Sequence, residues 1–450
     1  MNHFLFEDFK PVVPAFWKQK IQMDLKGADY NQSLLWHSNE GIVVKPFYTQ
    51  EDRNNVAITL PQKGFAICQS IFVHNESIAN KLALDAISRG ATAIQFYANQ
   101  PFRPKKLLRN ITSTVTLYFN LNFLDLDFIQ QIDRECSQNT RFYQLDILGN
   151  LAKTGNWLKH YKADINTTKR IVQTVKHGIS VDATIYQNGG ATIVQQLAYT
   201  LSHTNEYIEL FGEECAKEIH YQFAVGSNYF FEIAKLRAFR MLHALLLKGR
   251  GIEDVIPHVF TQPSRRNKTI YDYNVNMLRT TSECMSAILG GSDTVSNTAY
   301  DAVYQKSNAF GERISRNQLL ILQQEAHLQE AQRFADGAYY IEQITKQLAE
   351  KALVIFKQLE KGSGFLSQLM AGTIQKKIQA SAQKEQEQFD EGKIVLVGTN
   401  KLINKNDRMK DHLELYPFQK KRHLKTLIPP ISQVRLSEVM EQQRLKTEDK

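Results

Sequence analysis

Residues 230–240 read Phe-Phe-Glu-Ile-Ala-Lys-Leu-Arg-Ala-Phe-Arg, and residues 271–281 read Tyr-Asp-Tyr-Asn-Val-Asn-Met-Leu-Arg-Thr-Thr. The first run continues as a helix whose predicted apolar face comprises Phe230, Ile233, Ala234, Met241, Ala244 and Leu245. A strand is expected near Val255, and a second helix, from about Asn274 to Leu289, ends at the Gly290-Gly291 pair. Helix, strand and helix in this order form the repeating unit of a parallel α/β layer, so residues 230–291 predict the fold class.

The same alternation runs upstream of this stretch and continues after it. Strands are predicted at 66–72, 93–97, 114–120, 141–148, 179–186, 220–224 and 293–297. Helices are predicted between them at 77–89, 123–136 and 191–201. So many strand–helix units in one run predict an α/β protein with a closed (β/α)8 TIM barrel rather than an open sheet.

Two further segments flank the predicted barrel domain at 49–365. Residues 1–48 are predicted to form an N-terminal arm with a helix at 15–25, and its aromatic side chains are Phe4, Phe6, Phe9, Phe16 and Trp17. Such side chains need a surface to cover, which is either a partner or the arm's own barrel. Helices are expected at 308–330, 339–359 and 365–389, a strand at 393–400 and a basic tail at 401–450. Residues 366–450 are therefore predicted to form a helical extension that ends in a linker-like tail.

Composition limits the function classes. The 450 residues carry a formal net charge of +9, and the basic runs at 103–109 and 420–425 have no recognisable nucleic-acid-binding fold around them. A solvated surface is therefore the favoured interpretation of the charge. The chain has no apolar run near the roughly 20 residues of a membrane span and no signal-peptide pattern. The cysteines Cys68, Cys136, Cys215 and Cys284 form no CxxC pair, which predicts reduced thiols in a cytoplasmic protein.

The runs at 230–240 and 276–281 resemble the barrel of the methylmalonyl-CoA mutase family, and the resemblance extends over most of the chain. Members of that family rearrange methylmalonyl-CoA to succinyl-CoA with adenosylcobalamin. In that family the N-terminal arm wraps the other subunit. The resemblance therefore implies that Phe4, Phe6, Phe9, Phe16 and Trp17 contact a partner.

Residues 178–191 read Gly-Ile-Ser-Val-Asp-Ala-Thr-Ile-Tyr-Gln-Asn-Gly-Gly-Ala and decide whether this chain carries the chemistry. They resemble the catalytic stretch Ser-Ile-Ser-Gly-Tyr-His-Met-Gln-Glu-Ala-Gly-Ala, whose histidine donates a hydrogen bond to the thioester carbonyl. Alignment on Gly190-Ala191 places the Tyr-His pair on Thr184 and Ile185. Isoleucine has no donor and cannot polarise a carbonyl. The resemblance thus implies no catalytic, cofactor-binding or metal residue in this chain.

Other features of the family's catalytic chains are also missing from the sequence. Residues 64–79 lack the stretch that supplies a radical-guiding tyrosine. The Asp-x-His-x-x-Gly motif of the cobalamin-binding domain does not occur, and Asp411-His412 has the wrong spacing. Asp182, Arg237, Arg240 and Arg279 belong to retained motifs. We expect them to form ion pairs that stabilise the barrel, although relict ligand contacts are the alternative.

The resemblance implies the small, non-catalytic subunit of a heterodimeric, adenosylcobalamin-dependent methylmalonyl-CoA mutase of propionate metabolism. This chain would lack a cobalamin-binding domain, and the large catalytic subunit would bind adenosylcobalamin and substrate. No nucleic acid and no membrane are expected as partners. The alternative is an acyl-CoA-binding mutase barrel that works with a separate cobalamin-binding chain, and a third hypothesis is a scaffold or chaperone-like partner of the mutase.

Overall fold

The computed structural model describes residues 5–10, 12–53, 58–61, 64–420 and 425–448, without the side chains of residues 331 and 332. Its main feature is an eight-stranded parallel sheet with the order β6-β5-β4-β3-β10-β9-β8-β7. The outer strands meet, because the Tyr143 N–H donates to the His177 carbonyl at 3.0 Å and the Ser180 N–H donates to the Leu145 carbonyl at 2.8 Å. The predicted (β/α)8 barrel is therefore confirmed. The strands are β3 (Ala66–Phe72), β4 (Ala93–Ala98), β5 (Thr116–Leu121), β6 (Arg141–Tyr143), β7 (Ile179–Asp182), β8 (Ile219–Val225), β9 (Val259–Pro263) and β10 (Thr294–Ser296).

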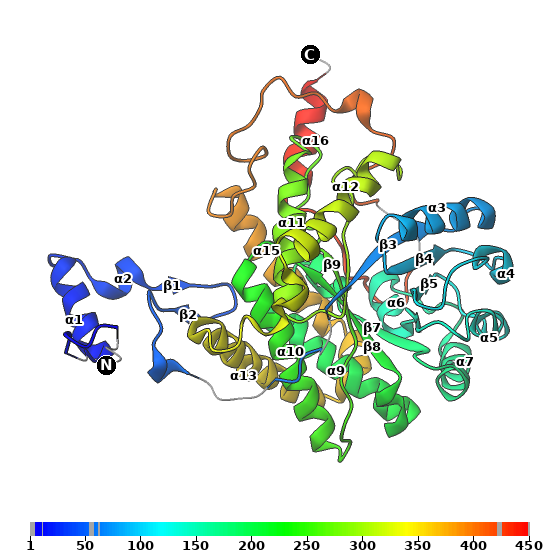
Figure 1. Ribbon diagram of the computed structural model, residues 1–450, viewed down its shortest axis with the longest axis horizontal. Coiled ribbons are helices and arrows are strands. Elements are labelled where there is room, and N and C mark those ends of the chain that lie inside the picture. Colours follow the sequence, from blue (N-terminus) through cyan, green and yellow to red (C-terminus); the bar gives the residue numbers. More distant parts are fainter. Residues whose placement is uncertain (1–4, 11, 54–57, 62–63, 421–424, 449–450) are drawn as a thin grey trace.

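Helices cover the outside of the barrel (Figure 1). Several begin at side-chain caps, such as Asn75 before α3, Asp125 before α5 and Thr192 before α9, whose side chains accept hydrogen bonds from the first turn. The barrel helices are α3 (Glu76–Ser88), α4 (Pro104–Leu107), α5 (Leu126–Glu135), α6 (Ile147–Thr154), α7 (Tyr161–Thr174), α8 (Thr184–Asn188), α9 (Ile193–Phe211), α10 (Tyr229–Gly249), α11 (Val275–Leu289) and α12 (Ala309–Leu320).

The predicted apolar face of α10 is partly wrong. Phe230 and Leu245 are 48% and 49% exposed, whereas the neighbouring Phe231 and Leu242 are buried. The reason is that α10 packs between the barrel and the long helix α13 (Tyr339–Lys361), so that most of its circumference is covered. A single 3.6-residue stripe therefore could not identify the buried side.

Several predicted elements end earlier than expected. The strands predicted at 141–148 and 179–186 are shorter because α6 and α8 begin within them. The strand expected near Val255 begins a few residues later, as β9. The helix at 308–330 is broken into α12, a π turn and a 3-10 turn. The helix at 365–389 consists of α14 (Gly364–Met370) and α15 (Thr373–Asp390), which are separated at Gly372 (φ 74°).

The strand predicted at 393–400 is wrong. The described chain has only an isolated bridge between Val397 and Lys401 there. Gly398 adopts a φ of 82°, and a Cβ added to it would lie 2.5 Å from the Asp272 side chain. This left-handed turn packed against Asp272 reverses the chain and prevents a continuous strand. The tail contains one further helix, α16 (Glu438–Thr447).

The inside of the barrel is polar. Ser70 Oγ donates to Gln95 Oε1 at 2.6 Å and lies 3.0 Å from Ser296 Oγ, and Gln95 Nε2 donates to Gln144 Oε1. Gln95 is fully buried and Gln144 is 5% exposed. Branched aliphatic side chains normally fill such barrels. Here a hydrogen-bonded layer of short hydroxyls and amides fills the middle instead.

An aromatic and imidazole layer lies below it, at the start of the strands. The Phe142 ring stacks on His258 with ring centroids 4.0 Å apart and on His177 at 4.8 Å. His220 is fully buried, and neither of its ring nitrogens has a hydrogen-bond partner in the described part of the chain. Burial lowers the pKa of His258 to about 4 and lowers the pKa of His220 well below its usual range. These histidines are therefore neutral in the folded protein at neutral pH.

This layer should make the fold sensitive to acid. The unfolded chain takes up protons at the ordinary histidine pKa of about 6.5, while the folded chain does not, so stability is lost as the pH falls below that value. We expect His258 to contribute a fall of about 1–2 kcal/mol in the free energy of unfolding between pH 7 and pH 5. Urea titrations of the wild type and of His258→Gln isolate this contribution from carboxyl groups that titrate in the same range. Equal pH slopes in the two proteins would show that His258 has the same pKa in the folded and unfolded chains and would contradict this prediction.

The N-terminal arm stands away from the barrel, where α1 (Pro14–Asp24) and α2 (Tyr30–Leu34) project to one side (Figure 1). No residue of α1 is buried. Phe6, Phe9, Phe16 and Trp17 are 74%, 73%, 64% and 55% exposed, and Phe4 lies outside the described residues. These four described aromatic side chains of the arm are therefore mostly accessible in this chain by itself.

The base of the arm is attached to the barrel helices. A hairpin of β1 (Trp36–His37) and β2 (Val43–Val44) follows α2. Ile42 is 1% exposed, the Trp36 ring meets Phe231 at 5.5 Å, and the Val194 N–H donates to a Glu40 carboxylate oxygen at 3.2 Å. The arm thus divides into an attached hairpin and a projecting segment before it.

Candidate functional site

The carboxyl ends of the strands form the mouth of the barrel, where this fold places its functional groups. Asp146, after β6, accepts hydrogen bonds from the Gly149 N–H at 2.6 Å and from the Tyr207 hydroxyl at 2.6 Å. His203 Nε2 lies 3.1 Å from the same carboxylate. Burial alone would raise the pKa of Asp146, but His203 and these hydrogen bonds outweigh it and hold the pKa below its usual value.

His203 continues this network into the core. Its Nδ1 lies 2.9 Å from the Tyr186 hydroxyl, and its ring stacks on Phe365 at 4.6 Å. Sequence reasoning missed this group, because Asp146 and His203 are distant in the chain and only tertiary packing, which places α9 against β7 and α8, joins them. None of Asp146, Tyr186, His203 and Tyr207 lines the cavity at the mouth that is described below. The network therefore serves to hold α6, α8 and α9 together.

Thr184 and Ile185 lie in the first turn of α8, just after β7. Ile185 is 2% exposed and belongs to the main hydrophobic core. The Thr184 N–H donates to Asp182 Oδ1 at 3.1 Å, and the Thr184 hydroxyl donates to the same atom. Burial raises the pKa of Asp182, and Lys153 acts in the opposite direction. Neither side chain at 184–185 offers a free hydrogen-bond donor to the mouth.

Strand β7 also offers a second alignment with the catalytic stretch. Matching Ile179-Ser180 to the Ile-Ser of that stretch places the Tyr-His pair on Asp182 and Ala183. Alanine, like isoleucine, has no hydrogen-bonding side chain. Both alignments therefore leave the position of the thioester-polarising histidine without a donor.

A cavity of 320 Å³ lies at the mouth beside β9 and β10. Its walls include Asn188, Ser264, Arg265, Thr298 and Tyr300. The chain segments at 415–419 and 433–435 also line it. Asn188 Oδ1 accepts from the Ser264 hydroxyl at 3.1 Å and from the Arg265 N–H at 2.9 Å. The guanidinium of Arg265 is exposed and makes no ion pair with any described residue. Among the described residues of this wall, it is the one cation that could meet an anionic ligand without breaking an existing contact.

A segment at 425–437, called the strap below, runs across the mouth. Leu427 and Ile428 donate backbone hydrogen bonds to the Gly155 carbonyl at 3.0 and 3.1 Å, and Ile431 donates to the Ala152 carbonyl at 2.8 Å. A Cβ at Gly155 would lie 2.4 Å from the Ile428 carbonyl oxygen, so only glycine permits this close approach. At the other end, Arg266 Nη1 donates to the Val434 carbonyl at 2.8 Å.

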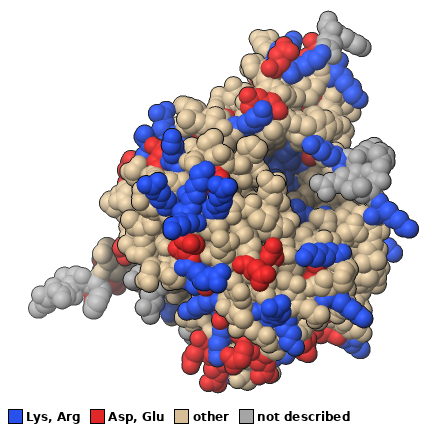
Figure 2. All heavy atoms as spheres, turned by 90° about the vertical axis from the view of Figure 1, so that its right-hand side faces the viewer, with Lys and Arg blue, Asp and Glu red and all other residues tan. Residues whose placement is uncertain are grey.

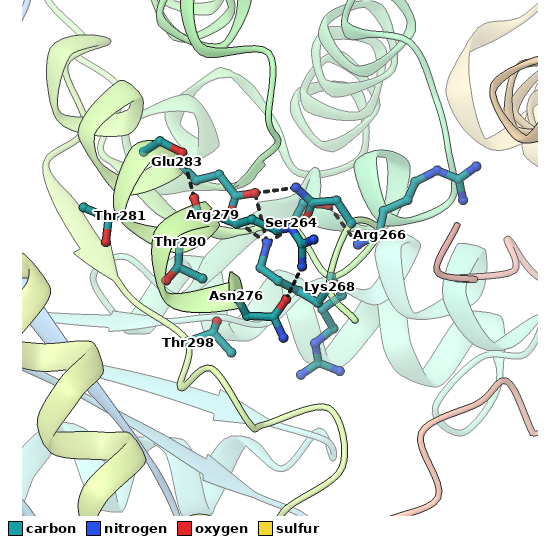
Figure 3. A network of polar contacts seen from close by, with 12 residues as sticks. Ser264, Arg266, Lys268, Asn276, Arg279, Thr280, Thr281, Glu283 and Thr298 are labelled. Carbon is teal, nitrogen blue, oxygen red and sulfur yellow. Dashed lines mark hydrogen bonds and ion pairs between the residues drawn. The ribbon is translucent and has the colours of Figure 1, made fainter. Parts of the chain in front are cut away.

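A buried polar network supports the loop after β9 (Figure 3). Lys268 Nζ lies 2.7 and 2.9 Å from the two carboxylate oxygens of Glu283, and Asn267 Nδ2 donates to Glu283 at 2.6 Å. Lys268 and Glu283 are 4% and 1% exposed. Burial lowers the pKa of Lys268 and raises that of Glu283, while the pairing of the two opposes both shifts. The pair therefore occupies positions where an unpaired charge would be unfavourable.

The four charged residues of the family-like motifs, Asp182, Arg237, Arg240 and Arg279, all contact other groups of the chain. Arg237 pairs with Asp336 at 2.7 Å and Arg240 with Asp293 at 2.8 Å, which confirms the ion pairs expected for these two arginines. Arg279 instead donates to Asn276 Oδ1, Thr269 Oγ1 and the Val397 carbonyl at 2.7–2.9 Å (Figure 3). Asp182 accepts from Thr184 and forms no ion pair within the described ranges. For Arg279 and Asp182, hydrogen bonds replace the expected ion pairs.

The surface charge and the four cysteines agree with what the composition predicts. On the face that carries α3 to α7, Lys and Arg side chains are interspersed with Asp and Glu side chains (Figure 2). Cys68, Cys136, Cys215 and Cys284 are all buried and free, as predicted. Within the ranges that the structure describes, no helix is both long enough and apolar enough to cross a lipid bilayer.

These observations define a parallel (β/α)8 barrel whose mouth is covered by a strap and lacks a histidine at β7. The sequence profile described as methylmalonyl-CoA mutase matches residues 129–444, which is more than half of the chain. The chain belongs to the methylmalonyl-CoA mutase family.

Individual relatives are similar over long stretches. The chain is 29% identical to the methylmalonyl-CoA mutase small subunit of Porphyromonas gingivalis over 99% of this chain and 78% of that protein. It is 33% identical to the methylmalonyl-CoA mutase of Cereibacter sphaeroides over 86% of this chain and 64% of that protein. It is 26% identical to the small subunit of Streptomyces virginiae over 81% of this chain and 65% of that protein. The match to the methylmalonyl-CoA mutase of Rhizobium meliloti, at 32% identity, covers 53% of this chain and 35% of that protein.

Proposed function

We propose that this chain is the small, non-catalytic subunit of a heterodimeric, adenosylcobalamin-dependent methylmalonyl-CoA mutase. The observation that carries the proposal is the loss of the donor after β7, where Thr184-Ile185 or Asp182-Ala183 replaces Tyr-His. Two relatives that match over most of this chain bear the name small subunit, which supports the assignment. In this proposal the complex isomerises methylmalonyl-CoA to succinyl-CoA in the cytoplasm, as a step of propionate metabolism.

The mouth of the barrel does not fit adenosylcobalamin. The strap is hydrogen-bonded across the carboxyl ends of the strands, where a flat corrin would have to lie. Among the described residues, no histidine lines the 320 Å³ cavity that remains, and this volume is at the lower limit of small-molecule sites, which span about 300–1,000 Å³. A corrin macrocycle is larger than the ligands of such sites. The proposal therefore places adenosylcobalamin and the radical chemistry on the large catalytic subunit.

In this proposal the role of the chain is to supply a stable barrel and a surface for the large subunit. The exposed Phe6, Phe9, Phe16 and Trp17 support this role, since clusters of exposed aromatic side chains are typical of interfaces. The alternative is an acyl-CoA-binding barrel that works with a separate cobalamin-binding chain. Arg265, which has no ion-pair partner among the described residues, favours that alternative, because it could meet the anionic end of a coenzyme A ester.

The purified chain alone is expected to show no mutase turnover when it is given adenosylcobalamin and methylmalonyl-CoA. It should also leave the visible absorption bands of the corrin unchanged. Adding a complete mutase chain should produce a stable one-to-one complex with activity, which size-exclusion chromatography with light scattering would weigh. Tight stoichiometric corrin binding by the lone chain, or turnover with an isolated cobalamin-binding chain, would rule out the proposal in favour of the alternative.

A further inference from the structure

A second cavity lies on the flank of the barrel, between α3 and α12 at the carboxyl end of β3. Its volume is 820 Å³, and it shares no lining residue with the cavity at the mouth. Phe72, Leu82 and Phe310 line it and are 54%, 51% and 48% exposed. This volume lies within the range of small-molecule sites, about 300–1,000 Å³. The flank cavity thus combines sufficient size with open apolar walls.

The charged groups of the flank cavity leave an excess of positive charge. Arg89, Lys306, Arg313 and Arg316 line it, against the carboxylates of Asp85 and Glu312. Asp85 already forms an ion pair with Arg89, whose Nε lies 2.8 Å from the Asp85 Oδ1. Glu312 accepts hydrogen bonds from Ser307 and Gln69, and its burial raises its pKa. Lys306 and Arg313 form no ion pair in the described part of the chain.

Arg316 is the buried member of this group. It is 6% exposed, and its Nη1 donates to Gln69 Oε1 at 2.9 Å. Its Nε has no hydrogen-bond partner among the described residues. A buried guanidinium with unused donors is unfavourable unless an acceptor is supplied. The wall of the cavity therefore contains a buried cation whose hydrogen-bonding capacity the described residues do not satisfy.

Helix α12 begins at the same wall and adds to the positive potential. Asn308 caps the helix by accepting from the Gly311 N–H at 2.8 Å, and both Asn308 and Ala309 line the cavity. The amino end of a helix favours anions. The Arg313 guanidinium lies 5.5 Å from the centre of the Phe310 ring. Positive charge and an exposed aromatic ring are thus adjacent.

We propose that the flank cavity binds a nucleoside phosphate. The exposed rings of Phe72 and Phe310 offer stacking surfaces for a flat base. Arg313, Arg316 and the first turn of α12 offer donors for the phosphate oxygens. This inference goes beyond the assignment as a subunit and does not depend on it, because the subunit assignment rests on β7 and the arm.

The test uses the purified full-length chain and a fluorescent N-methylanthraniloyl derivative of ADP, followed by anisotropy. Arg313→Met and Arg316→Met are each expected to weaken binding at least about tenfold, as the loss of one charge-assisted hydrogen-bonding group would. Arg313 is exposed, so its variant remains informative even if Arg316→Met fails to fold. Arg134→Met, on an exposed arginine of α5, is the matched control and should bind as the wild type does.

Competition by unlabelled compounds tests whether the base and the phosphate of the ligand both contribute to binding, and which compound supplies them. Unlabelled ADP should displace the probe, while pyrophosphate and adenosine should each compete at least about tenfold more weakly. Coenzyme A also contains a nucleoside phosphate. Comparing how strongly coenzyme A and ADP displace the probe therefore shows which of the two the cavity prefers. The proposal is overturned if millimolar probe does not bind, if both arginine variants bind normally, or if pyrophosphate or adenosine competes as well as ADP. Such a failure leaves the subunit assignment untouched, because that is tested by complex formation.

Discussion

Deleting residues 1–27 is expected to leave the barrel folded and to abolish the complex with the large subunit. The deleted segment includes α1, which buries no residue, so its loss removes little from the fold. It also removes the exposed Phe6, Phe9, Phe16 and Trp17, which together form the most accessible aromatic surface of the arm. The melting temperature should therefore stay close to that of the full chain, while light scattering of the mixture should show two separate species.

The attached hairpin sets the boundary of this deletion. A cut at residue 45 would also remove Trp36 and Ile42, which pack on the chain's own helices, and would confuse lost binding with lost folding. Trp17→Ala tests the same surface more gently and should weaken the complex by about 2 kcal/mol. Tyr161→Ala, which removes an exposed aromatic side chain on α7, is the matched control and should leave the affinity unchanged. Full affinity after the deletion would show that the arm does not contact the partner.

Lys268→Met is expected to destabilise the chain by about 3–5 kcal/mol, because it leaves the Glu283 carboxylate buried without its cation. Lys268 Nζ is 2.7 Å from Glu283 Oε2, and both side chains are nearly inaccessible. Urea titration of the purified variant measures the loss. Lys217→Met removes one partner of an exposed pair, with Glu214 at 3.0 Å, and should change stability by less than about 1 kcal/mol.

A double variant distinguishes an unpaired charge from lost packing. Lys268→Met combined with Glu283→Gln removes both charges and keeps an amide oxygen that can accept from Asn267. It should recover a large part of the stability lost by Lys268→Met alone. If the double variant is as unstable as the sum of the two single variants, the packing of the Lys268 side chain and not its charge stabilises the loop after β9.

The fold could be predicted from the sequence where local pattern and tertiary packing agree. Strand β3 has the predicted bounds, 66–72, because Gly64 and the helix-capping Asn75 flank it as clear breaks. Strand β7 was predicted to be too long, since Ile-Ser-Val-Asp-Ala-Thr-Ile-Tyr alternates like a strand. The chain turns into α8 because Asp182 accepts from the Thr184 N–H, and periodicity alone does not detect such a local hydrogen bond.

The candidate site was predictable only in part. The missing donor after β7 and the aromatic arm could be identified from residue types. The Asp146–His203 pair could not, because it depends on how α9 packs against β7 and α8. The Nε of Arg316, which has no hydrogen-bond partner among the described residues, also has no sequence signal, since an arginine on a helix is normally paired or solvated. The Asp146–His203 pair and the environment of Arg316 both arise from contacts between segments that are distant in the chain, and no local motif indicates them.

The strap has a consequence for the order in which the chain folds. Its partners Ala152, Gly155 and Arg266 precede it in the chain by more than about 150 residues, so its contacts close very large loops. During synthesis the barrel strands are complete well before the strap emerges, and the mouth is open in that interval. Contacts of such long range form late in folding. We therefore expect docking of the strap to be one of the last steps of folding, and a barrel that has not yet docked it would expose its polar interior to water.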